Sequence, residues 1–415
     1  MRIKRYQFNG MPFVAIIDEN DCPACPYASA YLSTQFGRAF NTQLRKANEL
    51  LFVLDYFGRK KIDLAERVQS GQLISQKEYL QFHTASAGKK QHDEQQPFVD
   101  CRPDVSAKSL RNALSANARQ LARVSSETHK GRLRRLRQYL ETLYQHFHDF
   151  FSADPAIVDR CEKLSSLIKL DEDSLGRNRP QGVADPTDSV ISDEGFERLR
   201  EMTLPSSANN PFKGSKIRNY LIVSILAESG IRRGALAKLK ISDFQFYGGF
   251  DLIKIYRSSI DQTDPRLDKP NQKTKAHFAR IPPSLMGQIK HYINHVRSEV
   301  PGSDQHDFVF VSEKGSRGTL GMPLSLKSVN GILQSLSEAL GFYVHPHLLR
   351  HKWNETFDKE GSEQGLEDRL LADARNYAMG WTANTTMGKT YNEKRIAERA
   401  RAISAAHQKR VDKKR

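Results

Sequence analysis

Several side chains near the C-terminal end of the sequence suit chemistry on a phosphodiester. His347 and Arg350 lie three residues apart, and Tyr391 follows Trp381. A tyrosine phenol can attack phosphorus and form a covalent phosphodiester. The forked guanidinium of arginine can hold the charge that develops on the non-bridging oxygens. With a second arginine, such a set could cleave a DNA strand without a metal ion or water as the nucleophile.

A second arginine lies upstream, in the segment Ser229-Gly-Ile-Arg-Arg-Gly-Ala-Leu236, directly after an apolar, helix-like run. This segment and the C-terminal residues resemble the active site of the tyrosine recombinase (phage-type integrase) family. The resemblance places Arg232 at the family's first catalytic arginine. Relatives commonly carry a glutamate where Ala235 stands, so the bracing of this arginine differs here.

A lysine hairpin is expected between the two arginines. The segment from Asn271 to Pro282 resembles the hairpin that carries the family's catalytic lysine. A lysine there protonates the departing 5′ oxygen, which lowers the barrier for the leaving group. We choose Lys273, and Lys275 stays open as the alternative because the spacing does not decide between them.

The remaining positions follow from the same resemblance. His347 and Arg350 share one helical face, with Arg350 as the second phosphate clamp. His347 either donates a hydrogen bond to the phosphate or takes the proton of the nucleophile. Trp381 occupies a slot that is histidine in most relatives and could donate its indole N–H to a phosphate oxygen. Tyr391, one residue further from Trp381 than is common, is the nucleophile. The predicted catalytic set is Arg232, Lys273, His347, Arg350, Trp381 and Tyr391, with no cofactor and no metal.

Composition agrees with a nucleic-acid partner. The chain has 64 Lys and Arg against 48 Asp and Glu, a formal net charge of +16, which suits binding to phosphates. A length of 415 residues predicts two or three domains. The sequence contains no apolar run of membrane-spanning length and no signal-peptide pattern. We therefore expect a cytoplasmic protein that joins the nucleoid when bound to DNA, with no membrane partner.

The pattern of elements predicts a multidomain, mainly α-helical protein with a small β-sheet. The resemblance implies a helical core-binding domain and an α+β catalytic domain. The expected divisions are 1–35, a β-like N-terminal arm with strands over 3–8 and 12–17; 36–175, the core-binding domain; 176–190, a linker; and 191–415, the catalytic domain with a basic tail helix.

Three local patterns carry more specific expectations. Asn41 is placed to cap a helix that ends near Gly58. A second helix over 131–151 has a leucine face, and its crowded arginines form either a solvated face or a DNA-backbone contact. Cys22 and Cys25 have the spacing of a zinc or redox pair, although free thiols are the default in a reducing compartment.

The resemblance implies a site-specific recombinase that acts on double-stranded DNA through a 3′-phosphotyrosyl intermediate. Strand exchange between two duplexes implies four protomers on DNA, with accessory DNA-bending or directionality proteins as possible partners. A type IB topoisomerase, which uses the same residues, and a non-catalytic DNA-binding protein on the same scaffold are the alternatives. A basic RNA-binding protein is disfavoured because the sequence has no aromatic stacking motif.

Overall fold

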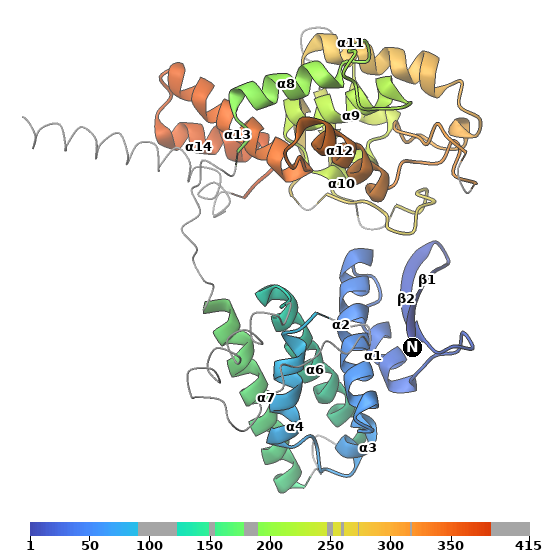
Figure 1. The fold of residues 1–415 in the computed structure, drawn as a ribbon, viewed down its shortest axis with the longest axis vertical. Helices are drawn as coiled ribbons and strands as arrows, with labels where there is room; N and C mark the ends of the chain where they lie inside the picture. The colour runs from blue at the N-terminus through green and yellow to red at the C-terminus, as the bar shows by residue number, and fades with distance from the viewer. Residues whose placement is uncertain are drawn as a thin grey trace, which may run out of the picture. The chain divides into compact units, whose positions relative to one another are not determined.

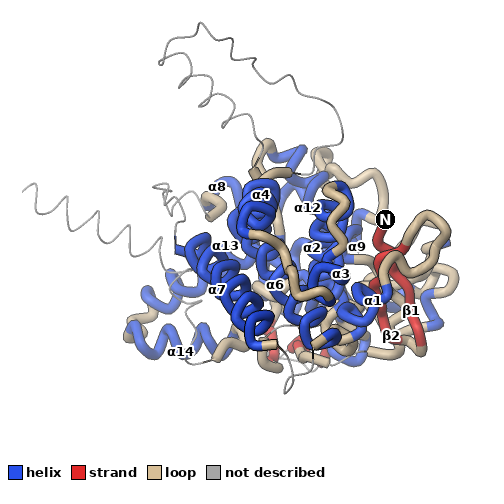
Figure 2. Tube along the Cα trace, turned by 90° about the horizontal axis from the view of Figure 1, so that it is seen from below, coloured by secondary structure: helices blue, strands red, loops and turns tan. Residues whose placement is uncertain are grey.

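The computed structural model describes residues 1–89, 123–148, 154–177, 190–246, 252–258, 261–272, 274–315 and 318–382. The chain divides into two compact units, Met1–Gln181 and Gly182–Arg415. Helices make up most of the described chain, and strands occur as short segments (Figures 1 and 2). The predicted fold class, mainly α with small β-sheets, is therefore confirmed. Among the described residues, no helix has the length and apolar character that a membrane crossing requires.

The first unit is a helical assembly with one β-hairpin. Its elements are β1 (Arg2–Phe8), β2 (Met11–Ile17), α1 (Pro26–Ser33), α2 (Phe40–Arg59), α3 (Leu64–Gln69), α4 (Gln76–Ser86), α6 (Ser126–Phe147) and α7 (Pro155–Arg177). The hairpin turns at Gly10, whose φ of +70° suits glycine, and this confirms the expected strand pair. Val14 and Ile16 of β2 join the helical core, so the hairpin packs as part of this unit.

The two predicted helices of this unit exist, with different starting points. The residue preceding α2 is Ala39, which makes no side-chain cap, so the expectation that Asn41 caps this helix is wrong. The helix α6 begins at Ser126, ahead of the expected start, because the Ser125 side chain accepts a hydrogen bond from the Thr128 backbone N–H. The leucine face of α6 is buried as predicted; its members are Leu133, Leu136, Leu140 and Leu143.

The arginines of α6 are bonded inside the first unit, and for the buried Arg132 and Arg135 neither expectation holds. Arg135 is only 2% exposed and Arg132 only 9%. A buried guanidinium requires partners, because its charge has lost the stabilisation of water. The partners are the Glu49 carboxylate for Arg135, the Ser86 carbonyl for Arg132, and the Glu172 carboxylate for both Arg134 and Arg137.

The second unit surrounds one buried helix. Its elements are α8 (Asp193–Thr203), α9 (Lys216–Ser229), α10 (Arg233–Lys238), β3 (Phe244–Gln245), β4 (Leu252–Ile255), β5 (His277–Arg280), α11 (Pro283–His291), α12 (Leu326–Leu340), α13 (Pro346–Glu363) and α14 (Asp368–Ala378), with short helical turns at Ile241–Asp243, Tyr292–Arg297 and Ser303–Gln305. The strands form an antiparallel sheet in the order β3-β4-β5. Most of α9 is buried, and it contacts α8, α10, α11, α12 and α13. Both ends of α9 are therefore fixed by their neighbours.

The buried pair between Arg135 and Glu49 gives a test of the first unit. Arg135→Ala leaves the Glu49 carboxylate, which is 11% exposed, with only the longer ion pair to the exposed Arg45, at 3.8 Å. We expect the free energy of unfolding to fall by about 3–5 kcal/mol, as for other broken buried pairs. Chemical denaturation would measure it. Lys163→Ala is the control, because Lys163 and Asp159 form an exposed pair on α7 and its loss should change little. Equal stability of the two variants would contradict the interpretation.

Candidate active site

One hydrogen bond joins the two arginine segments. Arg350 on α13 is 1% exposed, and its Nη1 donates to the Gly230 carbonyl oxygen at 2.6 Å. Gly230 is the residue at which α9 ends, and its φ is +60°. Arg232 follows two residues later, directly before α10. The bond therefore holds both predicted phosphate-clamping arginines at the junction of α9, α10 and α13.

Gly230 has no room for a side chain. A Cβ atom there would lie 2.8 Å from Met379 and 3.0 Å from the indole of Trp353. Trp353 is itself fixed, because its Nε1 donates to the Glu228 carbonyl at 2.9 Å. Met379, Trp353 and Trp381 form one apolar cluster. The end of α9 thus packs directly against α13 and the segment that follows α14.

Trp381 lies against Arg350. The Arg350 guanidinium carbon is 5.2 Å from the centroid of the Trp381 ring, a distance that favours a cation–π contact. The Trp381 backbone N–H donates to the Asn376 carbonyl at 2.8 Å. A buried ion pair between Arg375 of α14 and Asp358 of α13 holds these two helices together. The tertiary structure therefore places Trp381 beside Arg350.

The His347 imidazole lies within the electrostatic range of both arginines. His347 sits in the first turn of α13, and its side chain is exposed. Partial burial of the ring lowers its pKa, and the positive charges of Arg350 and Arg232 lower it further. The ring is therefore neutral at pH 7 in the absence of an anion. An anion bound beside both guanidiniums would also lie close to His347.

The lysine loop runs against the same junction. A Cβ atom at Gly234 of α10 would lie 2.6 Å from the Asn271 carbonyl oxygen. Further along, the Lys275 backbone N–H donates to the Gly380 carbonyl at 2.9 Å, and the Lys275 side chain is exposed. Lys273 and Tyr391 lie outside the described residues. Their roles stay predictions, whereas the other four predicted catalytic residues are described and occupy one region.

The segment that precedes the lysine loop begins at Ser258 and ends at Asn271, and these two residues are bonded to each other. Neither belongs to the predicted catalytic set. Asn271 closes the base: its Nδ2 donates to the Ser258 carbonyl, and its Oδ1 accepts from the Gln272 backbone N–H at 2.8 Å. Lys238 of α10 is only 3% exposed, and its Nζ donates to the Ser258 hydroxyl at 2.6 Å. Burial lowers the pKa of Lys238. These bonds fix the point from which residues 272–275 depart.

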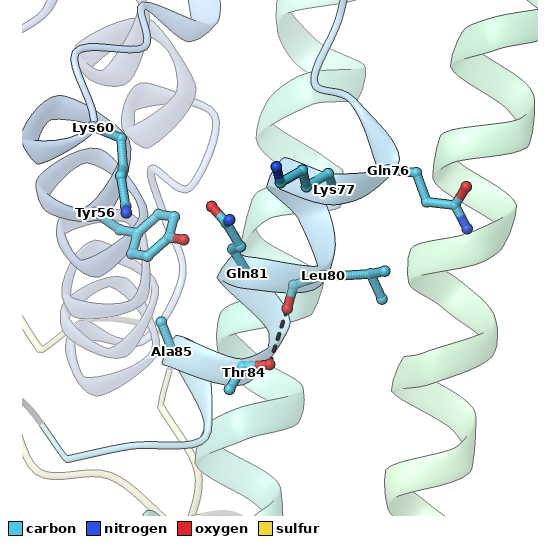
Figure 3. A pocket seen from close by; sticks show the side chains of 8 residues that line it. All are labelled: Tyr56, Lys60, Gln76, Lys77, Leu80, Gln81, Thr84 and Ala85. Carbon is cyan, nitrogen blue, oxygen red and sulfur yellow. Dashed lines mark hydrogen bonds between the residues drawn. The ribbon is translucent and has the colours of Figure 1, made fainter. Parts of the chain in front are cut away.

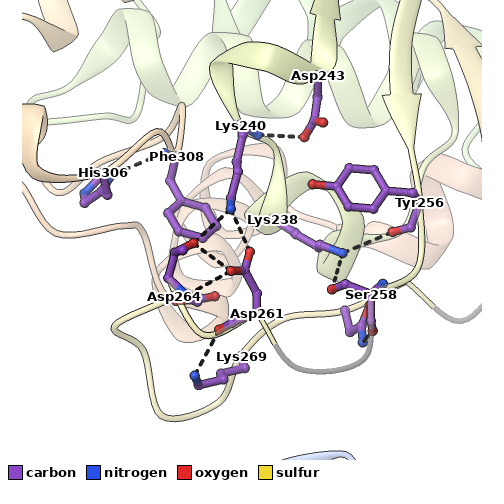
Figure 4. Close-up of polar contacts among 12 residues, drawn as sticks. Lys238, Lys240, Asp243, Tyr256, Ser258, Asp261, Asp264, Lys269, His306 and Phe308 are labelled. Carbon is purple, nitrogen blue, oxygen red and sulfur yellow. Dashed lines mark hydrogen bonds and ion pairs between the residues drawn. The ribbon is translucent and has the colours of Figure 1, made fainter. Parts of the chain in front are cut away.

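The middle of the same segment is also bonded to the domain (Figure 4). Lys240 and Asp261 form an ion pair at 2.8 Å, and the Lys269 Nζ donates to the Asp261 carbonyl at 3.0 Å. Nearby, Arg266 pairs with Asp264 and donates to the Ala237 carbonyl at 2.8 Å. The number of residues between Ser258 and Lys269 is visible in the sequence, whereas the bonding partners of these side chains are not.

Residues 198–397 match the model of the phage integrase family. The matched range begins within α8 and contains every one of the predicted catalytic positions. This part of the chain is similar to the phage integrase family. The matched range, called the integrase domain below, lies within the unit in which the two arginines meet.

Two of the similar curated proteins are named tyrosine recombinase XerA. The tyrosine recombinase XerA of Pyrococcus furiosus is 29% identical over 197 residues, which are 45% of this chain and 59% of that relative. XerA of Pyrococcus horikoshii is 24% identical over 283 residues, 65% of this chain and 88% of the relative. A crystal structure of the XerH site-specific recombinase bound to its difH substrate aligns with 91% of this chain and 84% of that chain, at a TM-score of 0.48 and 16% identity.

The described residues offer no metal centre. No group of three or more His, Cys, Asp or Glu side chains in the described ranges could hold a metal ion. Cys22 is exposed, and Cys25 lies 3.7 Å from the Tyr139 hydroxyl. In the part of the chain that is described, the Cys22 and Cys25 pair is therefore not part of such a group.

A second candidate surface lies on the first unit, apart from the integrase domain. A shallow groove of about 740 Å³ runs between α2 and α4 (Figure 3). Leu80 in this groove is 53% exposed. The lining is mostly apolar, and it also contains two lysines and several neutral polar side chains. The lining includes Tyr56, Lys60, Lys77, Leu80, Gln81 and Thr84.

The packing at Gly230 can be tested against a matched glycine. Gly230→Ala introduces both left-handed backbone strain and the overlap with Met379 and Trp353. Gly341, which ends α12 with a φ of +78°, has nothing within 4 Å of its Cβ position. We expect Gly341→Ala to cost about 1–2 kcal/mol from strain alone. Overlap should make Gly230→Ala cost about 1–3 kcal/mol more.

Thermal unfolding of the two variants would measure this difference. Gly230→Ala should also weaken DNA binding, because it displaces the carbonyl that holds Arg350. Equal losses of stability in both variants would show that Gly230 serves only as a helix end.

Proposed function

We propose that this protein is a site-specific tyrosine recombinase that cleaves and rejoins double-stranded DNA. The observation that carries the proposal is the meeting of Arg232 and Arg350 beside one imidazole, His347, within an integrase-family domain. Two forked cations near a neutral histidine suit a phosphodiester and its trigonal-bipyramidal transition state. The curated relatives that are named tyrosine recombinases support the same reaction class.

The first chemical step is a transesterification. Arg232 and Arg350 hold the non-bridging oxygens, and the Tyr391 phenol oxygen attacks phosphorus. The bond from phosphorus to the 5′ oxygen breaks, and Lys273 protonates that oxygen as it leaves. A 3′-phosphotyrosyl intermediate and a free 5′-hydroxyl result. The phosphotyrosine keeps the energy of the phosphodiester, so the reaction needs neither ATP nor a metal.

The second step reverses the first with a different strand. A 5′-hydroxyl from the partner duplex attacks the phosphotyrosine, and Tyr391 leaves. Two duplexes exchange strands through four cleavages, so we propose four protomers in the working assembly on DNA. The segment after Tyr391 would join neighbouring protomers, with accessory DNA-bending or directionality proteins where the site requires them. Such a reaction on chromosomal DNA places the protein in the cytoplasm, at the nucleoid.

The first unit would act as the core-binding domain. Its α6 arginines are committed to internal partners, so they are poor candidates for DNA contacts. The groove between α2 and α4 is the better candidate, because Lys60 and Lys77 line it beside neutral hydrogen-bonding side chains. Lysines contribute phosphate affinity, and neutral polar groups can contact base edges. The net charge of +16 supports the same partner.

The nucleophile can be tested by trapping the intermediate. Purified protein is incubated with sheared genomic DNA from its source without metal, quenched with detergent, and the attached strands are sequenced. We expect covalent adducts through Tyr391 that cluster at one sequence. Tyr391→Phe should abolish the adducts and keep DNA binding, because only the hydroxyl is removed. Tyr377→Phe, an exposed tyrosine of α14, is the control and should behave as the unaltered chain.

The outcomes of this experiment separate the rival functions. Adducts scattered over many sequences would point to a type IB topoisomerase. DNA binding without any adduct would favour the non-catalytic scaffold. Adducts that persist in Tyr391→Phe would assign the nucleophile to another residue.

The general acid can be assigned on the site found in that way. Lys273→Ala should slow cleavage by about 10²–10⁴-fold, the usual contribution of a positioned acid. A substrate whose 5′ bridging oxygen is replaced by sulfur should restore the rate, because a thiolate leaves without a proton. Lys275→Ala is the matched comparison and should show neither effect. The reverse pattern would assign the role to Lys275.

A further inference from the structure

His277, which the predicted catalytic set does not include, is held at the edge of the same site. It begins β5, two residues after Lys275, and its Nδ1 lies 3.1 Å from the Lys275 carbonyl oxygen. A carbonyl oxygen only accepts, so Nδ1 carries the hydrogen. A Cβ atom at Gly380 would overlap Nδ1 and lie 3.0 Å from Cε1 of the ring. The Nδ1 and Cε1 edge therefore faces Gly380 and the Lys275 carbonyl.

The ring cannot easily leave this position. The Lys275 backbone N–H donates to the Gly380 carbonyl at 2.9 Å, so the two residues that contact the ring are also bonded to each other. Gly380 has a φ of +62°, a conformation that permits its backbone to approach the ring. On the sheet side, His277 pairs with Ile255 of β4. Its position is thus fixed by β4, the lysine loop and the residue that precedes Trp381.

The positive charges of Arg350 and Arg232 lower the pKa of both His277 and His347. Partial burial lowers the pKa of His277, the Lys275 carbonyl raises it, and the charges of Arg350 and Arg232 lower it further. Among the described residues, no acidic group acts on the ring: β4 pairs Ile255 with His277, and the segment after α14 presents the Gly380 backbone. Nε2, the ring nitrogen bonded to Cε1, has no hydrogen-bond partner among the described residues.

We propose that His277 is a further catalytic residue, whose Nε2 binds a non-bridging oxygen of the phosphate held by Arg232 and Arg350. This inference rests on the proposed recombinase function. An imidazolium donates from both nitrogens, so Nδ1–H would serve the Lys275 carbonyl while Nε2–H serves the phosphate. The phosphate charge offsets the repulsion from the arginines and raises the pKa of the ring. The site then takes up a proton when DNA binds.

The direction of the pH effect follows from this coupling. The phosphate-bound state has the higher imidazole pKa, so it binds more protons than the free state between the two pKa values. DNA affinity therefore rises as the pH falls through the pKa of the bound state, and it levels off below the pKa of the free state. Protonation of His347 would raise DNA affinity in the same way, so each histidine must be tested separately.

Two substitutions of His277 separate phosphate binding from a structural role. His277→Asn keeps an amide donor near the Nδ1 position for the Lys275 carbonyl and removes Nε2. His277→Gln places an amide near the Nε2 position, where it can donate but cannot titrate. We expect His277→Asn to slow adduct formation about 10²-fold, as for the loss of one transition-state donor, and His277→Gln to lose much less. His295→Gln, an exposed histidine distant in sequence from the site segments, is the control and should change nothing.

Proton uptake provides the second readout. Calorimetric binding of a 30-base-pair duplex in two buffers of different ionisation enthalpy counts the protons taken up, with Tyr391→Phe chains to prevent cleavage. Uptake should fall in both His277 variants and stay unchanged in His295→Gln. An unaltered adduct rate in His277→Asn, or unaltered uptake in His277→Gln, would overturn the proposal. If the unaltered chain forms no adduct, the proposed function fails, and the proton count still decides the role of His277 in phosphate binding.

Discussion

The hydrogen bond from Arg350 to the Gly230 carbonyl is the contact on which the rest of the site depends. It joins residues 120 positions apart and lies in a buried environment. A guanidinium with 1% exposure requires such a partner, because its charge cannot be solvated there. The bond orients Arg350, and it also fixes the end of α9, from which Arg232 departs. A glycine is needed at this point because the turn has a positive φ and the indole of Trp353 fills the space above it.

A second glycine, Gly380, organises the opposite side of the site. Its backbone bonds to Lys275 and packs against the ring of His277, while the next residue lies against Arg350. The proposed phosphate site is therefore formed by four segments that are distant in sequence. These are the junction of α9 and α10, the start of β5, the first turns of α13, and the residues after α14. Small shifts of any one segment would change the distances to the other three, and transition-state stabilisation depends strongly on such distances.

Basic composition and basic surface differ in this protein. The sequence carries a net charge of +16, yet its densest arginine cluster, on α6, is used inside the first unit. Arg135 and Arg132 connect α6 to α2 and to the end of α4, so they stabilise a helical assembly. Charge counts therefore indicate the class of partner, and burial decides which of the charges can reach it. The exposed lysines beside α2 and α4 are better placed for that contact than the buried arginines.

The sequence by itself determined what depends on local pattern and residue chemistry. The first β-hairpin and the leucine face of α6 could be predicted, and the types and order of Arg232, His347 and Arg350 are what suggested the site. Only the tertiary structure decided that Arg135 is buried and that His277 lies beside Gly380. The physical reason is that helical periodicity and capping act over a few residues, whereas these contacts join segments roughly a hundred residues apart. Which charged side chains are buried follows from the packing of whole helices, and no short stretch of sequence encodes that packing.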